Sequence, residues 1–248
     1  MIFASFYAQI KNATQTDELH RFNKALTVFS QFQGFFGGYG RDQFNIALTA
    51  KSTNLTTGVL LSGDSGDDMF NLTLPKAALK ALAANKGKLI ADDGEGGTET
   101  LPALLLDGGE DYVFGKDTDY DTLNFSVPRD TLFNISVIAG SKVGSDGHAN
   151  DVAAVRANGQ LLTTFYGIEW FELDLGAGND KVTTKYSAVI NTYDGNDNIV
   201  TEGGVNYITG GLGADTIVGG GYDVVYYNTA SIIDIAKPKT QCWRSKRR

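Results

Sequence analysis

Aspartates that follow glycine at a fixed distance are the residues of this sequence best suited to binding a ligand. They occur in a nine-residue pattern, Gly-Gly-x-Gly-x-Asp-x-(apolar)-x, which residues 37–45 and 210–218 match at every defined position. Residues 63–71 differ from the pattern at one position, where Asp64 replaces the second glycine. The carboxylate and the carbonyl groups of such a turn offer only oxygen atoms, which are the ligands that a hard cation such as calcium prefers.

The spacing of the aspartates in the C-terminal part favours a stack of short coils. Asp197, Asn206 and Asp215 follow one another at nine-residue intervals, Asp223 comes eight residues later, and Asp180 lies seventeen residues before Asp197. If two coils make one turn of a roll, residues about eighteen apart lie above one another. We therefore expect Asp180, Asp197 and Asp215 along one edge, and Asn206 and Asp223 along the opposite edge.

The glycines of each repeat permit a left-handed turn and let successive turns stack closely. Stacked turns direct their carbonyl oxygens inward beside the Asp carboxylate, and together they are expected to provide the six to eight oxygens that calcium requires. The residues expected to bind metal on this argument are Gly38, Gly40, Asp42, Gly66, Asp68, Asp111, Asp121, Gly178, Asp180, Gly195, Asp197, Asn206, Gly211, Gly213, Asp215, Gly221 and Asp223.

Upstream of residue 173 the repeats are interrupted by insertions. Asp68 follows Asp42 after 26 residues, and Asp111 follows Asp68 after 43. The second gap contains residues 75–84, whose alanine, leucine and lysine content, with Pro75 in the first turn, predicts a helix. These gaps leave it open whether the N-terminal aspartates meet in one site.

Two more elements are expected from local patterns. The dipeptide Asn158-Gly159 between apolar runs predicts a β-hairpin. Residues 17–33 carry apolar side chains at helical spacing and are followed by Gly34, which predicts a second helix.

Together these patterns predict an all-β protein, a parallel β-roll or β-solenoid of glycine-aspartate nonapeptide repeats with small helical and hairpin insertions. We expect an interrupted repeat region with a helical insertion at residues 1–128, a hairpin-containing β segment at 129–172, and a calcium-binding β-roll at 173–236. Residues 237–248 are expected to form a disordered basic tail, either a native arm or the product of a shifted reading frame.

Charge and composition exclude several classes of function. The net charge is −8, but six basic residues and no acid lie in residues 237–248, and without these six the 21 Lys and Arg fall to 15 against 29 Asp and Glu. An acidic body repels nucleic acid and attracts cations. The single Cys242 and the two histidines, His20 and His148, do not suffice for a zinc site.

Membrane insertion and a leader peptide are not expected from the sequence. No apolar run approaches the roughly 18 residues that are needed to span a bilayer. Residues 1–10 are apolar but lack a basic leading region and a small-residue cleavage site.

The repeats resemble those of the repeats-in-toxin (RTX) family of haemolysin-type calcium-binding proteins, which bacteria secrete. The resemblance rests on the two complete nonapeptides, the nine-residue phase, and residues 166–180, which are similar to the segment that leads into the repeats of large members. It implies calcium-dependent folding outside the cell, after one-step export by a type I secretion system. It also implies an extracellular structural or adhesive protein, with extracellular polysaccharide or a cell surface as candidate partner. No enzyme activity is expected, because the sequence has no His-Glu-x-x-His, no Gly-x-Ser-x-Gly and no phosphate-binding loop.

Competing interpretations involve catalysis or another kind of cation site. Ser65 lies in a Gly-Asp-Ser-Gly segment like that of serine proteases, but it occupies the variable position of a repeat. The alternative of a polysaccharide epimerase or lyase with structural calcium would use His148 with Asp146 and Asp151. A module that tethers an absent partner enzyme is equally compatible with the sequence.

Residues 117–121 imitate the beginning of an EF-hand loop, because three aspartates alternate with other residues. The sixth position of such a loop is Thr122 instead of glycine, and the twelfth is Pro128 instead of glutamate. A degenerate cation site of the repeat type is therefore the preferred interpretation of Asp121.

Overall fold

The chain is mostly β-structure, as expected. The computed structural model describes residues 19–26, 33–48, 59–85, 89–92, 98–101, 104–109, 112–113, 116–117, 119–143, 149–227, 231–236 and 244–247. Within these ranges one helix, α1 (Lys76–Asn85), accompanies 23 strands. The predictions that fall on other residues, among them Asp111, Asp146 and His148, lie outside the described part of the chain.

Most of the strands belong to two large sheets, here called sheet I and sheet II. Sheet I consists, in spatial order, of β1 (Leu19–Leu26), β3 (Arg41–Leu48), β5 (Met69–Thr73), β11 (Thr122–Ser126), β15 (Trp170–Asp174), β17 (Ser187–Asn191), β19 (Val205–Thr209), β21 (Tyr222–Tyr227) and β23 (Arg244–Arg247). All pairs of neighbouring strands in sheet I are parallel.

Sheet II has a parallel arrangement that is broken once, by the predicted hairpin. Its spatial order is β2 (Gln33–Tyr39), β4 (Val59–Ser65), β8 (Leu104–Asp107), β14 (Gln160–Tyr166), β13 (Ala149–Ala157), β12 (Ile135–Val143), β16 (Lys181–Thr184), β18 (Asn198–Thr201), β20 (Gly213–Val218) and β22 (Ser231–Ala236). Strand β13 pairs antiparallel with β12 and β14. Asn158 and Gly159 join β13 to β14 with φ of 48° and 79°, the left-handed pair that a two-residue hairpin turn requires.

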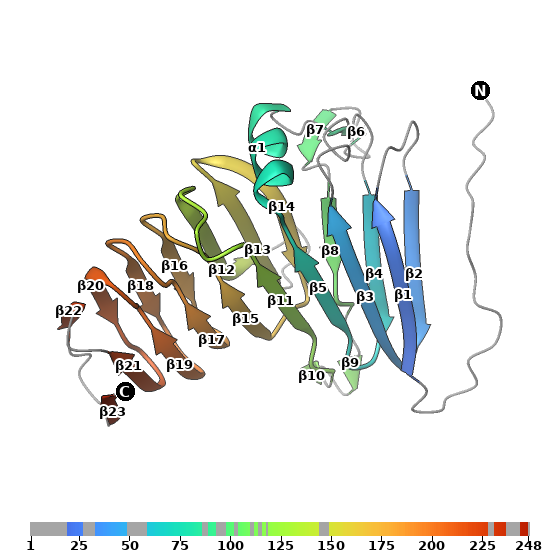
Figure 1. Ribbon diagram of the computed structural model, residues 1–248. Coiled ribbons are helices and arrows are strands. Elements are labelled where there is room, and N and C mark those ends of the chain that lie inside the picture. The colour runs from blue at the N-terminus through green and yellow to red at the C-terminus, as the bar shows by residue number, and fades with distance from the viewer. Residues whose placement is uncertain are drawn as a thin grey trace, which may run out of the picture.

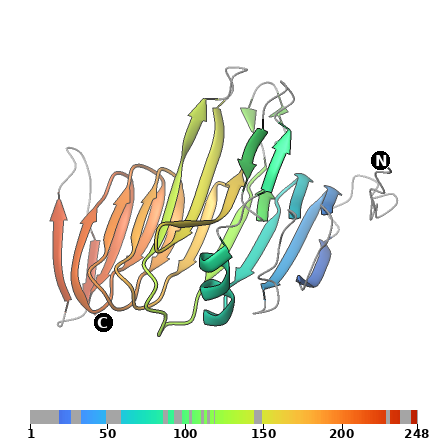
Figure 2. The ribbon, with the colours of Figure 1, turned by 90° about the horizontal axis from the view of Figure 1, so that it is seen from above.

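The chain passes back and forth between the two sheets, so that each coil adds one strand to each of them (Figure 1). The exception is the coil with the hairpin, which adds β12, β13 and β14 to sheet II. The colours advance from blue to red along the stack, except at the hairpin, where β14, β13 and β12 lie in the reverse of their sequence order (Figure 2). We call the side where the chain passes from sheet II to sheet I the Asp42 edge, and the side where it passes from sheet I to sheet II the Asp180 edge.

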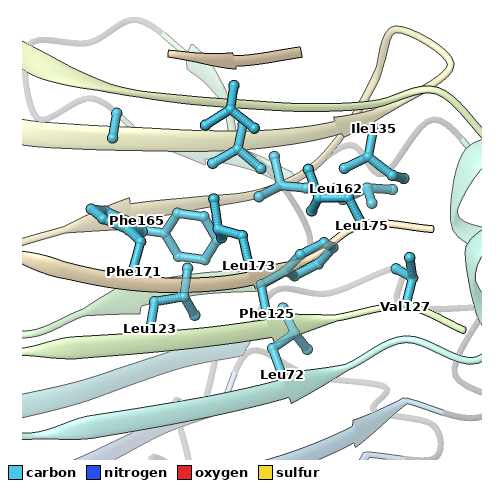
Figure 3. Packing of buried hydrophobic residues seen from close by; sticks show 14 of the residues in the cluster. Leu72, Leu123, Phe125, Val127, Ile135, Leu162, Phe165, Phe171, Leu173 and Leu175 are labelled. Carbon is cyan, nitrogen blue, oxygen red and sulfur yellow. The ribbon is translucent and has the colours of Figure 1, made fainter. Parts of the chain in front are cut away.

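The hydrophobic core lies between the two sheets, because alternate residues of each strand point inward. In β11, for example, Leu123 and Phe125 are buried while the residues beside them are partly exposed. Side chains from several coils meet in this layer (Figure 3). Phe44 and Phe70 occupy equivalent places in successive coils, and their rings stack with centroids 4.9 Å apart.

The helix and two small strand pairs leave the stack without disturbing the order of the strands. The predicted helix at residues 75–84 is confirmed as α1, which follows β5, and its buried Ala78 and Leu79 join the core. Two small antiparallel pairs, β6 (Leu89–Asp92) with β7 (Thr98–Leu101) and β9 (Tyr112–Val113) with β10 (Lys116–Asp117), also stand outside the large sheets.

Two expectations fail near the ends of the chain. The helix expected at residues 17–33 is wrong, because Leu19–Leu26 form β1, which pairs in parallel with β3 over eight residues. Backbone hydrogen bonds to an existing sheet outweigh a local helical spacing here. In the tail expected to be disordered, Arg244–Arg247 form β23 and pair with β21. Among the described residues, no helix is both long and apolar enough to cross a membrane.

Glycine is required at the turns because backbone from one coil lies directly against the next. A Cβ atom at Gly211, where φ is 96°, would overlap the carbonyl group of Tyr193 in the preceding coil. Gly38 has nearly the same backbone angle, with φ of 97°, but a Cβ there would meet nothing within 4 Å.

These two glycines separate the cost of backbone strain from the cost of stacking. We expect Gly38→Ala to lower the free energy of unfolding by about 1–2 kcal/mol, the cost of a left-handed backbone for alanine. Gly211→Ala should cost a further 1–3 kcal/mol or so, because its coil must move away from Tyr193. Urea unfolding of both variants at one calcium concentration checks this, and equal losses would contradict the close stacking.

Candidate metal site

Aspartates one coil apart form a hydrogen-bonded ladder along the Asp42 edge. The backbone NH of Asp42 donates to Oδ1 of Asp68 at 2.7 Å, and the NH of Asp68 donates to Oδ1 of Asp121 at 2.7 Å. The NH of Asp121 donates in turn to Oε2 of Glu169 at 2.9 Å. Each carboxylate thus uses one oxygen to hold the backbone of the neighbouring coil.

A second ladder runs along the Asp180 edge. The NH of Asp180 donates to Oδ1 of Asp197 at 2.8 Å, and the NH of Asp197 donates to Oδ1 of Asp215 at 3.1 Å. The ladder begins at Ile135, whose NH donates to Oδ1 of Asp180 at 2.7 Å. The sequence-based expectation that these three aspartates lie above one another is therefore confirmed.

The register of the strands explains why the same bond recurs. Asp180 and Asp197 each come directly before a strand, and β16, β18 and β20 pair so that Lys181, Asn198 and Thr216 are neighbours. On the other edge, α1 and the two small hairpins lie in loops between the coils, so Asp68 and Asp121 still align although 53 residues separate them.

Asparagines reinforce the Asp180 edge with bonds of the opposite direction. The NH of Asn196 donates to Oδ1 of Asn179 at 2.8 Å, and the NH of Ala214 donates to Oδ1 of Asn196 at 2.8 Å. Asn134 accepts from the NH of Asn179 in the same way. This ladder was not predicted, although the repetition of Asn directly before Asp180 and Asp197 was visible in the sequence.

The second carboxylate oxygen of four ladder aspartates is buried and unsatisfied. Asp68, Asp121, Asp180 and Asp215 are each no more than 2% exposed. Their Oδ2 atoms have no hydrogen-bond partner among the described residues. A buried oxygen that gives up water without a new partner raises the free energy of the fold, and more so if it is charged.

At the Asp42 edge these oxygens converge with backbone carbonyl groups beside glycine. A Cβ at Gly63 would lie closer than 3.0 Å both to Oδ2 of Asp68 and to the carbonyl oxygen of Gly108 in the next coil. The same holds at Gly108, which faces Oδ2 of Asp121 and the carbonyl oxygen of Gly167. Carboxylate and carbonyl oxygens from two successive coils therefore meet at one place, and the arrangement repeats.

Burial shifts the proton equilibrium of these carboxyl groups upward. It raises the pKa of Asp68 to about 8 and that of Asp121 to about 10, and neighbouring carboxylates add to the rise although the ladder hydrogen bonds oppose it. On the other edge burial raises the pKa of Asp180 and of Asp197 to about 7, and that of Asp215 above its usual range. A cation that balances their charge would reverse the shift.

Asn206 and Asp223 meet as predicted, but they form a different arrangement. They pair across β19 and β21, and Nδ2 of Asn206 donates to Oδ1 of Asp223 at 2.8 Å. Thr201 Oγ1 donates to the same oxygen at 3.0 Å, and the NH of Gly221 to Oδ2 at 3.4 Å. Asp223 is thus hydrogen-bonded at both oxygens, unlike Asp68, Asp121, Asp180 and Asp215. In the strand register Asp223 is aligned with Ala188, two residues further into its strand than the positions of the ladder aspartates on the Asp42 edge.

The predicted glycines lie where the coils turn. Gly38, Gly40 and Gly66 are on the Asp42 edge with positive φ, as are Gly195, Gly211 and Gly213 on the Asp180 edge. Gly178 packs against the Phe133 carbonyl group, and Gly221 against that of Gly204. In the described residues no three His, Cys, Asp or Glu side chains form a cluster, so any metal here must also use backbone oxygens.

The ladders suit calcium in the type of their ligands. They offer carboxylate and carbonyl oxygens, which are the donors of calcium sites, and they offer neither thiolate nor imidazole. The unsatisfied Oδ2 atoms of Asp68 and Asp121, which converge with the carbonyl oxygens of Gly108 and Gly167, mark where a cation would find oxygens from two coils.

Comparison with models of protein families, with curated proteins and with solved structures finds no match to this chain. The argument for a metal site therefore depends on the geometry of the two ladders.

The raised pKa values predict how stability depends on pH when calcium is removed. Asp180 and Asp197 have a pKa of about 7 in the folded protein against 3.8 for an ordinary aspartate, so the folded state binds more protons than the unfolded state. The stability they contribute is fully present below the unfolded pKa and is lost as pH rises through the folded pKa. In chelator, the urea midpoint should therefore fall between about pH 4.5 and pH 8.

Asp197→Asn tests the origin of this dependence, because asparagine does not titrate but keeps an oxygen for the NH of Asp180. Its midpoint should depend less steeply on pH than that of the original protein. A midpoint in chelator that stays constant or rises over this range would contradict the assignment.

Proposed function

We propose that this chain binds calcium ions along the two aspartate ladders and that binding completes its folding as a calcium-stabilised parallel β-roll. The observation that carries the proposal is the set of buried carboxylates of Asp68, Asp121, Asp180 and Asp215, whose second oxygen has no partner among the described residues. At Asp68 and Asp121 this oxygen lies beside carbonyl oxygens of the turns. The chain alternates between two large sheets whose strands pair mostly in parallel, which is consistent with a β-roll.

Charge repulsion supplies the reason for a cation. Without one, each ladder places several carboxyl groups a single coil apart in a buried environment, where ionised groups are costly. They must then stay protonated, or the coils must separate. A divalent cation between two carboxylates favours their ionised form and joins the coils, so that its binding free energy adds to the free energy of folding.

Calcium fits better than magnesium or zinc. Magnesium requires near-ideal octahedral geometry and gives up water reluctantly, whereas calcium accepts six to eight oxygens in irregular arrangements, as stacked turns offer. The few carboxylates in each site favour a dissociation constant of about 10⁻⁴–10⁻³ M, as in extracellular calcium modules. This supports a secreted structural or adhesive protein, as the resemblance to the RTX family implies.

A calcium titration followed by far-UV circular dichroism is the direct test of the proposal. At pH 8, where Asp180 and Asp197 ionise and their contribution to stability in chelator is lost, we expect a cooperative gain of β-structure signal as calcium rises into the millimolar range, and little change with equal magnesium. The gain arises because calcium removes the repulsion that keeps the coils apart. A spectrum that is already rich in β-structure in chelator and does not respond to calcium would contradict the proposal.

Asp197→Asn should separate the charge of the ladder from its hydrogen bonds. In chelator we expect an unfolding midpoint equal to or above that of the original protein, since a buried charge is gone and the amide oxygen still accepts from Asp180. With calcium we expect about tenfold weaker apparent affinity, equivalent to about 1.4 kcal/mol.

The matched control for this variant is Glu172→Gln, which removes the same charge from an exposed side chain of β15. It should leave both the calcium affinity and the midpoint in chelator unchanged. If the two variants respond alike, the calcium effect is a general response to net charge and not a property of the ladder.

A further inference from the structure

A groove of about 740 Å³ lies on the outer face of sheet I beside the Asp180 edge. Its floor crosses β17, β19 and β21, which are neighbours in the C-terminal half of the stack (Figure 1). Tyr207 and Tyr226 rise from the floor, Tyr193 and Asp194 come from a turn, and Arg129 comes from the segment after β11. Its volume is in the range of pockets that hold small molecules or short polymer segments.

The register of sheet I makes the floor of the groove continuous. Asn191, Thr209 and Tyr226 are neighbours across three successive strands, and Val189 and Tyr207 are neighbours two residues earlier. Strands lie about 4.8 Å apart, so such rows extend across the strands and parallel to the axis of the stack. A linear ligand can therefore lie along the row and contact several coils.

Tyr193 is held in place at one side of the groove by specific contacts. Its hydroxyl group donates to Oδ1 of Asp174 at 2.9 Å, and Nδ2 of Asn191 donates to the same oxygen at 2.9 Å. The guanidinium carbon of Arg129 lies 4.4 Å from the centre of the Tyr193 ring. These contacts fix the ring before any ligand arrives, which lowers the entropy cost of binding.

The backbone of Tyr193 is strained in a way that the stack does not require. Its φ is 66°, and the equivalent positions of the neighbouring coils are Gly176 and Gly211, with φ of 108° and 96°. Glycine adopts this conformation at no cost, whereas tyrosine does not. A strained residue that is kept where its neighbours have glycine is typical of a binding or catalytic position.

The lining of the groove favours sugars. Tyrosine rings offer flat apolar surfaces on which the C–H face of a pyranose packs, and their hydroxyl groups bond to polar partners. Asn191 and Asp194 add the amide and carboxylate groups that bind sugar hydroxyls. The lining contains one basic residue, Arg129, and one acidic residue, Asp194, and the body of the protein is acidic, so an anionic polymer is disfavoured.

We propose that this groove binds a neutral, linear oligosaccharide along the outer face of β17, β19 and β21. The site goes beyond calcium binding, since its side chains point away from the core and none of the ladder aspartates contributes to it. It depends on the coils being folded, and not on calcium itself.

Calorimetric titration with hexasaccharides of β-1,4-linked glucose and of β-1,4-linked mannose tests this site in protein that circular dichroism shows to be folded. At least one of the two neutral sugars should bind, and Tyr207→Ala should weaken that binding at least tenfold. Tyr207 is 40% exposed, so its removal should leave folding intact. Hexagalacturonate serves as the anionic comparison and should not bind.

Two further variants distinguish a loss of sugar contacts in the groove from a general loss of structure. Tyr222→Ala removes a tyrosine that is 72% exposed on the same face of β21 but outside the groove, and sugar affinity should not change. Tyr193→Gly restores the residue type of both neighbouring coils, so it should abolish sugar binding without lowering the urea midpoint.

Three results would overturn the proposal: no binding of either neutral sugar, binding of hexagalacturonate alone, or equal affinity of the original protein and Tyr207→Ala. The calcium response of Tyr207→Ala, followed by circular dichroism, should match that of the original protein. If the protein binds sugar but does not respond to calcium, the proposed calcium-binding function is contradicted and the sugar-binding groove is not.

Discussion

The close stacking of equivalent turns is the constraint on which the rest of this structure depends. Coils that add strands to the same sheets are about 4.8 Å apart, so whatever occupies one turn position touches its counterpart in the next coil. Glycine satisfies this constraint for the backbone, since a Cβ at Gly195 or Gly213 would overlap the preceding coil. Aspartate satisfies it only in part, because one carboxylate oxygen bonds to the next coil while the charge is brought beside another charge.

The two halves of the stack differ in how much apolar packing supports the ladders. Aromatic side chains such as Phe44, Phe70 and Phe171 fill the core of the N-terminal coils. The C-terminal coils rely on smaller side chains such as Ile199 and Ile217. Since the hydrophobic stabilisation scales with the apolar area buried, each C-terminal coil gains less from its core, and the charge balance of its turns weighs more in its stability.

The inner and outer faces of sheet I serve separate purposes. Inward-facing residues are repetitive because they pack in layers, and the turn residues are repetitive because they stack. The outward-facing residues repeat in the N-terminal coils, where Asn45, Asn71 and Asn124 are hydrogen-bonded in a row. In the C-terminal coils they depart from the repeat, as at Tyr207 and Tyr226. Two turn residues, Asp64 and Tyr193, occupy positions where a neighbouring coil has glycine, and their φ values of 71° and 66° are strained for residues other than glycine.

The sequence by itself determined the β class, the stacking of Asp180 under Asp197 and Asp215, the helix α1 and the hairpin at Asn158, because each depends on local spacing or on a short turn. Only the tertiary structure aligned Asp42, Asp68, Asp121 and Glu169, made a strand of Leu19–Leu26, and brought the groove residues together. The physical reason is that an insertion looped out between coils leaves strand register unchanged but erases the sequence period. Register is then set by pairing with the sheet, and surface side chains from different coils meet only once that pairing exists.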